Sequence, residues 1–301
     1  MAGWAYIDEG FVPAEEAKIS IFDLGFTRGD AVYDTTSVWK GSFFRLDDHI
    51  ARFFRSCAGM RMTCPHDAEA IKRILAACVA RAGLEDAYVQ MILTRGRFAN
   101  MQRRILSECT NRFIAYAVPY IWIIAPEKQE AGIDLAIVQN RRTPTEAIDP
   151  TVKNFNWMDL ERGLLESQAR GADHACLLTP AGHVAEGPGF NVFWARDRTL
   201  YTPKGNVLDG ITRRTVMELA AQMGVKVELG DFPADSLRGA DEAFLSSTAG
   251  GIMPVTRVDG RPLGNGAVGI LTGELRATYW RRREEGWLGT PVADLVAEKA
   301  A

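Results

Sequence analysis

The sequence predicts a mixed α/β (α+β) protein with a small α/β domain at residues 1–125 and a larger α/β domain with a β-barrel-like core at residues 133–301. Three observations lead to this prediction. Strand and helix periodicities alternate in the first part, residues 126–132 have the composition of a linker, and many short strand-like runs follow them. A chain of 301 residues that is 47% hydrophobic is long enough to bury two cores.

The first elements of the small domain are predicted to be strands. Short strands are expected at residues 5–8 and 17–20. A hairpin is expected from residues 32–39 and 42–45, because two runs of β-forming residues flank Lys40-Gly41.

Two helices and two long strands complete the predicted small domain. Apolar residues recur at helical spacing after Asp47 and again after Asp67, and Gly83 ends the second helix. Residues 88–94 and 112–124 are nearly continuous apolar runs, which are typical of buried strands.

The chain beyond the linker is predicted to be rich in strands with interspersed helices, which favours a β-rich layer or barrel-like core. The strands are expected at residues 133–139, 175–179, 191–195, 199–202, 225–229, 242–246 and 252–258, and the helices near residues 157–170, 212–223 and 267–283.

Composition excludes several classes of function. A net charge of −3 gives no basic field for nucleic acid. We expect no membrane segment, because no apolar run is long enough to span a bilayer, and therefore a cytoplasmic protein. The five cysteines lack C-x-x-C pairing, which fits a reducing compartment, and the four histidines lack the spacing of metal ligands, so we expect no metal.

Lys153 and Glu186 carry the most informative chemistry. Lys153 lies in Thr-Val-Lys-Asn-Phe-Asn-Trp-Met-Asp, and Glu186 begins Glu-Gly-Pro-Gly-Phe-Asn. A buried amine and a buried carboxylate both need partners, and pyridoxal phosphate needs an amine for its aldehyde and an acid for its ring nitrogen. The alternatives are a lysine that extends along the surface to solvent and a solvated glutamate in a turn.

Two segments are candidates for binding the phosphate of such a ligand. Gly210-Ile211-Thr212-Arg213 opens a predicted helix, so the N–H groups of Ile211 and Thr212 would point at an anion. The hydroxyl-rich turn at residues 246–251 ends a predicted strand and offers similar groups.

With these motifs the chain resembles the fold-type IV aminotransferases, the family of branched-chain and D-amino acid aminotransferases and (R)-selective amine transaminases. The resemblance extends from residues 11–13 to 250–255. It is closest to the (R)-selective amine transaminases at residues 43–50, 142–144 and 153–157.

The resemblance implies a pyridoxal 5′-phosphate site. Lys153 would be the Schiff-base lysine and proton shuttle, and Glu186 would keep the pyridine nitrogen protonated. Leu208 would pack on the ring, and Arg52 would pair with the phosphate, although an exposed helix arginine is the alternative for Arg52. The implied cofactor-binding residues are Lys153, Glu186, Arg52, Leu208, Ile211, Thr212 and Thr248.

The resemblance also implies a substrate pocket with apolar and aromatic walls. Its residues are Arg28, Tyr33, Thr35, Tyr88, Trp157 and Ala249. The carboxylate of an acceptor would meet Arg28 or an arginine of residues 95–104. Alignment by spacing places Met101 where the fungal enzymes carry their mobile arginine.

The implied function is ping-pong transamination from an (R)-amine to a 2-oxo acid such as pyruvate, in a homodimer with the active site near the interface. A D-amino acid or branched-chain amino acid transaminase is the nearest alternative, because it shares the cofactor residues. An aminodeoxychorismate lyase would release pyruvate without an acceptor, and a non-enzymatic binding protein would keep only the shell of the site.

Overall fold

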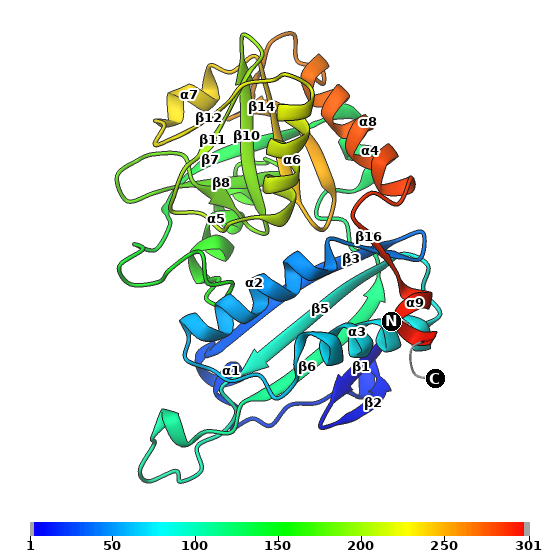
Figure 1. Ribbon diagram of the computed structural model, residues 1–301. Coiled ribbons are helices and arrows are strands. Elements are labelled where there is room, and N and C mark those ends of the chain that lie inside the picture. The colour runs from blue at the N-terminus through cyan, green and yellow to red at the C-terminus, as the bar shows by residue number, and fades with distance from the viewer. Residues whose placement is uncertain (1–2, 298–301) are drawn as a thin grey trace. The chain divides into compact units, whose positions relative to one another are not determined.

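The computed structural model describes residues 3–297 (Figure 1). Contacts within the chain divide it into two units. Unit 1 contains the chain up to Ile121, the segment Val152–Asn156 and the chain from Arg283 onward, and unit 2 contains Trp122–Thr151 and Trp157–Arg282. Both units combine a sheet with helices, so the predicted mixed α/β class is confirmed.

Unit 1 is built on a seven-stranded sheet in the order β16-β4-β3-β5-β6-β1-β2, and all its pairs are antiparallel. Its strands are β1 (Trp4–Ile7), β2 (Gly10–Pro13), β3 (Ala31–Trp39), β4 (Ser42–Phe44), β5 (Ala87–Thr94), β6 (Arg112–Pro119) and β16 (Gly289–Pro291). Its helices are α1 (Leu24–Arg28), α2 (Leu46–Gly59), α3 (Ala68–Ala82) and α9 (Val292–Ala297), with 3-10 turns at Ala14–Glu16 and Leu106–Glu108.

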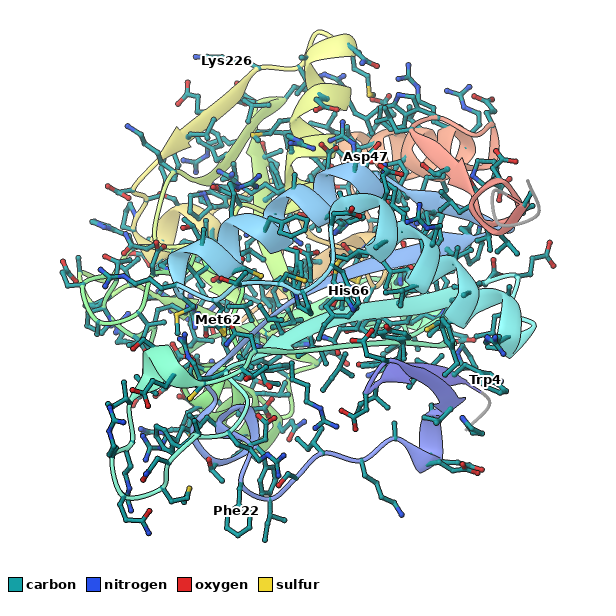
Figure 2. The ribbon with its side chains drawn as sticks, turned by 60° about the horizontal axis from the view of Figure 1, so that its bottom comes forward. Trp4, Phe22, Asp47, Met62, His66 and Lys226 are labelled. Carbon is teal, nitrogen blue, oxygen red and sulfur yellow. The ribbon has the colours of Figure 1, made fainter. Side chains whose placement is uncertain are left out.

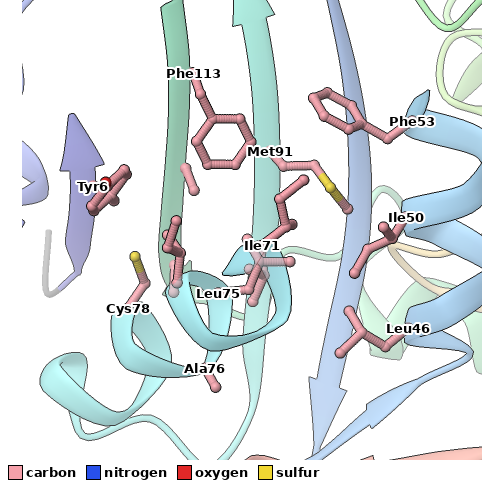
Figure 3. Close-up of a cluster of buried hydrophobic side chains, with 14 of the residues drawn as sticks. Tyr6, Leu46, Ile50, Phe53, Ile71, Leu75, Ala76, Cys78, Met91 and Phe113 are labelled. Carbon is pink, nitrogen blue, oxygen red and sulfur yellow. The ribbon is translucent and has the colours of Figure 1, made fainter. Parts of the chain in front are cut away.

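The core of unit 1 lies between the sheet and helices α2 and α3. Figure 3 shows Phe53 of α2, Ile71 and Leu75 of α3, and Met91 and Phe113 of the sheet pointing toward one another, and all five are buried. The apolar spacing that predicted the two helices therefore marks their core-facing sides.

Local signals place the elements of unit 1. Lys40 and Gly41 both have positive φ, 49° and 72°, as a two-residue turn between twisted antiparallel strands requires. Helix α3 begins where the Asp67 side chain accepts the Ala70 N–H at 2.8 Å, and it ends at Gly83, which is left-handed. The predicted hairpin and the two predicted helices are confirmed.

One predicted strand of unit 1 is wrong. Residues 17–20 form no strand, and a strand that was not predicted, β2 at Gly10–Pro13, pairs with β1. Asp8 and Glu9 have φ of 50° and 61°, so the chain reverses there and residues 10–13 pair directly with β1. The strand predicted at residues 112–124 also ends early, at Pro119, because proline cannot donate to a ladder.

Unit 2 is built on a nine-stranded sheet in the order β12-β11-β10-β13-β14-β7-β8, with β15 on β14 and β9 on β10. Its strands are β7 (Ile133–Arg141), β8 (His174–Leu178), β9 (Glu186–Gly187), β10 (Phe190–Arg196), β11 (Thr199–Pro203), β12 (Val227–Gly230), β13 (Glu242–Ser247), β14 (Gly251–Val258) and β15 (Arg261–Pro262). Its helices are α4 (Pro126–Ala131), α5 (Met158–Ala169), α6 (Ile211–Gln222), α7 (Ala234–Arg238) and α8 (Ile270–Glu284), and the end of α8 belongs to unit 1.

The two units differ from the predicted domain division. Residues 126–131 of the expected linker form helix α4, which starts with Pro126 and buries Gln129. A polar composition suits an exposed helix as well as a linker. The chain instead passes between the units at Ile121–Trp122, and Val152–Asn156 returns to unit 1.

Ile21, Phe22 and Phe26 of unit 1 are exposed, and Phe22 projects outward in Figure 2.

Among residues 3–297, no helix is long and apolar enough to cross a membrane. Within the same residues, no group of three or more His, Cys, Asp or Glu side chains is arranged to hold a metal ion.

Candidate active site

Lys153 belongs to a short segment that extends the sheet of unit 1. The Tyr33 N–H donates to the Lys153 carbonyl at 3.0 Å, and the Phe155 N–H donates to the Ala31 carbonyl at 3.3 Å. The Lys153 N–H donates to Ser56 Oγ of helix α2 at 3.0 Å. The backbone of Lys153 is therefore held by both β3 and α2, although no periodicity in the sequence marks this segment.

The side chain of Lys153 lies against an aromatic pair. Tyr33 and Phe155 stack with ring centroids 4.7 Å apart and planes 9° apart. Lys153 Nζ lies 4.4 Å from the centroid of the Tyr33 ring, a distance at which the ring face attracts an ammonium group. Lys153 is half-buried, so the packing restricts it more than an ordinary surface lysine.

Arg52 is buried, so the alternative of an exposed helix arginine is wrong. Its Nε donates to Asp34 Oδ2 at 2.7 Å and its Nη2 to Asp34 Oδ1 at 2.9 Å, a two-point pairing of guanidinium and carboxylate. His49 Nδ1 lies 2.7 Å from the same Oδ1. Asp34, His49 and Arg52 thus form a buried cluster between β3 and α2.

The protonation states of this cluster follow from its surroundings. Burial opposes the charged form of Asp34, but the charge of Arg52 and hydrogen bonds from His49 and Arg52 outweigh it and lower the carboxyl pKa well below its usual range. Burial, followed by the charges of Arg52 and Lys153, lowers the pKa of His49. A neutral His49 carries its hydrogen on Nδ1, because an ionised carboxylate only accepts.

Thr35 and Tyr88 belong to a polar network on the sheet of unit 1. Thr35 Oγ1 lies 3.4 Å from the Tyr88 hydroxyl and accepts from Gln90 Nε2 at 3.4 Å. Gln90 in turn accepts from the Tyr116 hydroxyl. Burial raises the pKa of Tyr88, so these four side chains stay uncharged near neutral pH.

The arginines expected near the pocket already have neighbours. The guanidinium carbon of Arg28 lies 5.3 Å from the centroid of the Phe98 ring. Arg95 donates to both oxygens of Asp30, and Arg103 donates to Glu108. Arg28, which the family resemblance assigned to the substrate pocket, is exposed.

Glu186 of unit 2 is buried, with 6% of its surface exposed, so the alternative of a solvated turn glutamate is wrong. Its Oε2 accepts from the Leu208 N–H at 3.0 Å and from Asn191 Nδ2 at 3.3 Å. Its Oε1 accepts from Arg142 Nη2 at 3.2 Å. Three donors from separate segments therefore support the carboxylate.

The start of helix α6 lies close to the carboxylate of Glu186. Gly210 is the N-cap, no side chain caps the helix, and its first turn has no acidic residue. A Cβ on Gly210 would lie 2.0 Å from Asn191 Oδ1, so only glycine lets the helix start this close. The Asn191 amide also donates to the Leu208 carbonyl at 3.0 Å, which connects the helix start to Glu186.

The turn between β13 and β14 offers hydroxyl groups. Ser247 Oγ donates to the Gly189 carbonyl at 2.8 Å and accepts from the Ala249 N–H at 3.2 Å. Ser246 Oγ is buried and has no hydrogen-bond partner within residues 3–297. Thr248, predicted to contact a phosphate, is half-buried in this turn.

The structure assigns the predicted residues to both units. Unit 1 holds Lys153, Arg52, Arg28, Tyr33, Thr35 and Tyr88, and unit 2 holds Glu186, Leu208, Ile211, Thr212, Thr248, Trp157 and Ala249. Sequence reasoning gave no role to Asp34, His49, Ser56, Arg142 and Asn191, all of which contact these residues. A carboxylate in the middle of a β-forming run was the available signal for Asp34.

Comparison with known proteins gives the class. A family model for amino-transferase class IV matches residues 31–258, and the chain belongs to this family. It is 32% identical to a branched-chain-amino-acid aminotransferase of Pseudomonas aeruginosa over 86% of this chain and 84% of that one. It is 31% identical to a D-alanine aminotransferase of Bacillus licheniformis over 85% of this chain and 89% of that one.

Solved structures agree with this assignment. A branched-chain amino acid aminotransferase of T.th., solved with pyridoxamine 5′-phosphate, is 30% identical, with a TM-score of 0.89 over 97% of this chain and 99% of that one. The branched-chain aminotransferase of the archaeon Thermoproteus uzoniensis, solved with norvaline, is 29% identical, with a TM-score of 0.87 over 96% of this chain and 99% of that one. The fold predicted from the resemblance is therefore confirmed.

Proposed function

We propose that this class IV aminotransferase uses pyridoxal 5′-phosphate to move an amino group from an (R)-amine to a 2-oxo acid such as pyruvate in a ping-pong reaction. The observation that carries the proposal is the support of Glu186 by Arg142, Asn191 and the Leu208 N–H. A buried, fixed carboxylate is the partner that a pyridine nitrogen requires.

The residues of each unit fit the groups of this cofactor. In unit 2, the start of α6 leaves no room for a side chain at Gly210 and has no acid in its first turn, which suits a phosphate. The buried Ser246 hydroxyl, which has no partner among residues 3–297, suits a ligand oxygen. In unit 1, Lys153 supplies the amine and Arg52 a cation.

The proposed roles follow the chemistry of each side chain. When bound, pyridoxal phosphate supplies an aldehyde that condenses with amines and a ring that withdraws electrons. Lys153 Nζ would hold the aldehyde carbon and move the proton of the substrate Cα. Glu186 would hold the proton of the ring nitrogen. Arg52, Ile211, Thr212 and Thr248 would bind the phosphate, and Leu208 would pack on the ring.

The uncharged character of the proposed pocket supports an amine donor. Among Arg28, Tyr33, Thr35, Tyr88, Trp157 and Ala249, only Arg28 is charged. The stacked Tyr33 and Phe155 beside Lys153 offer an aromatic wall to a bulky apolar group. Arg28 would accept the carboxylate of the 2-oxo acid.

A D-amino acid or branched-chain amino acid donor is the second candidate. The names of the two relatives given above refer to such substrates, and both relatives are similar to this chain. An amino acid donor would need a cation for its carboxylate in both halves of the reaction, whereas an amine donor needs one only for the acceptor.

We also expect the protein to be a cytoplasmic homodimer.

Two measurements test the proposal. The purified protein should show a yellow chromophore that borohydride fixes covalently, and Lys153→Met should abolish it, whereas Lys40→Met, at an exposed lysine paired with Glu284, should keep it. (R)-1-phenylethylamine, D-alanine and L-leucine should then be compared as donors with pyruvate. No reaction with the aromatic amine would reject the preferred donor, and a chromophore retained in Lys153→Met would reject the site.

A further inference from the structure

The cluster of Asp34, His49 and Arg52 has a geometry that the proposed reaction does not by itself require. Asp34 is fully buried on β3, and its two oxygens receive Nε and Nη2 of the same guanidinium. Two of the five N–H groups of Arg52 are therefore directed at one carboxylate, which fixes the plane of the guanidinium.

His49 fixes Asp34 in turn. His49 Nδ1 lies 2.7 Å from Asp34 Oδ1, and the Thr35 N–H donates to the same oxygen at 2.8 Å. His49 and Arg52 are three positions apart on α2, so one helix face supplies both partners of Asp34. Both oxygens of Asp34 therefore have hydrogen-bond partners, and two N–H groups of the guanidinium are held by this carboxylate.

The same helix face also holds Lys153. Ser56 lies four positions beyond Arg52, and its Oγ accepts the Lys153 N–H at 3.0 Å. The backbone of Lys153 and the guanidinium of Arg52 are therefore both held by α2 within unit 1. A group that binds both side chains would meet a cation and an amine that start from the same helix face.

We propose that Asp34 and His49 are positioning residues that orient Arg52 toward the phosphate of the cofactor. The inference rests on the proposed function, because it assigns a phosphate to Arg52. Asp34 binds the guanidinium from one side, and His49 prevents Asp34 from turning away. Neither residue contacts the cofactor in this proposal.

The test uses the difference between pyridoxal phosphate and pyridoxal, which lacks the phosphate. Asp34→Asn replaces one carboxylate oxygen by an NH₂ group, which cannot accept from Arg52. We expect the dissociation constant for pyridoxal phosphate to rise about tenfold or more, and that for pyridoxal to change less than about twofold. Both constants are measured by absorbance titration of the cofactor-free protein, without turnover.

Asp30→Asn is the matched control. Asp30 receives Nε of Arg95 at 3.0 Å and Nη2 at 3.1 Å in the same unit, so its substitution removes the same kind of pair elsewhere. We expect Asp30→Asn to keep the wild-type ratio of the pyridoxal constant to the pyridoxal phosphate constant. An equal change of this ratio in both variants, or no change in Asp34→Asn, would overturn the inference.

A second pair of variants decides the question if Asp34→Asn does not fold. His49→Gln keeps an N–H donor for Asp34, and His49→Leu removes it. The same ratio should fall in His49→Leu and recover in His49→Gln, and equal ratios in the two variants would reject the role of His49. Failure of the wild-type protein to bind either compound would reject the proposed function itself.

Discussion

Arg142 and Glu186 form a part-buried ion pair, with Nη2 of the arginine 3.2 Å from Oε1 of the glutamate. Arg142 is itself fixed, because its Nη1 donates to Asp159 Oδ2 at 2.6 Å. Asp159 also accepts the N–H and the hydroxyl of Thr143. The carboxylate of Glu186 is therefore supported by Arg142, and Arg142 is supported in turn by Asp159.

This support makes the charge of Glu186 testable. Glu186→Gln keeps the shape of the side chain and an acceptor for the Leu208 N–H, but it removes the charge. We expect kcat to fall by roughly 10²–10³-fold, the range of a lost acid–base or charge-stabilising group. Glu218→Gln, at a surface glutamate of α6 near Arg214, should keep kcat within about twofold of wild type. A Glu186→Gln variant with wild-type kcat would contradict the assigned role.

Gly210 provides a steric test of the helix start. In Gly210→Ala the new Cβ would lie 2.0 Å from Asn191 Oδ1, and Asn191 is held by Glu186 and the Leu208 carbonyl. We expect the free energy of unfolding to fall by about 2 kcal/mol, as for other overpacked sites, with weaker cofactor binding. Urea denaturation measures the first effect. Gly205→Ala has open space around its Cβ and should be neutral within about 0.5 kcal/mol.

Features set by neighbouring residues were predictable from the sequence. The hairpin at Lys40-Gly41 and the helix between Asp67 and Gly83 depend on turn and cap residues that lie within a few positions. The motif at Glu186 was also readable, because the glutamate and Asn191 lie in one continuous hairpin.

Features set by distant residues were not predictable in this way. The hydrogen bond from Lys153 to Ser56 joins residues 97 positions apart, and the contact of Asp34 with Arg52 crosses from a strand to a helix. A single sequence contains no local pattern for such contacts. The same reason explains why the segment around Lys153 was assigned to the larger domain.

The contact between Ser56 and Lys153 predicts a measurable cost. Ser56 is buried, with 1% of its surface exposed, so Ser56→Ala would leave the Lys153 N–H without its acceptor. A fully buried unsatisfied N–H group costs about 1–3 kcal/mol. Because Lys153 is half-buried, we expect a loss near the lower end of this range in urea denaturation of the cofactor-free protein. Ser107→Ala, at an exposed serine of the 3-10 turn Leu106–Glu108, is the control. Equal stabilities of the two variants would show that this contact does not hold the lysine segment.

His174 predicts how stability depends on pH. The imidazole is buried in unit 2 with its ring 4.8 Å from that of Phe190, and burial lowers its pKa from 6.5 to about 4, despite the opposing charge of Asp173. The unfolded chain therefore binds a proton at His174 below pH 6.5, while the folded chain does so only near pH 4. The contribution of this neutral histidine to stability is present above pH 6.5 and is lost as the pH falls toward 4.

A pKa shift of this size changes the free energy of unfolding by roughly 3 kcal/mol at most between pH 6.5 and pH 4. Urea denaturation at several pH values from 7.5 to 4 measures it as the difference between wild type and His174→Gln, because that variant loses the titrating group and keeps a polar side chain beside the Ala175 N–H. We expect His174→Gln to lose less stability than wild type over this interval. Parallel curves of stability against pH for wild type and His174→Gln would contradict this prediction, because they would mean that His174 binds its proton equally well in the folded and the unfolded protein.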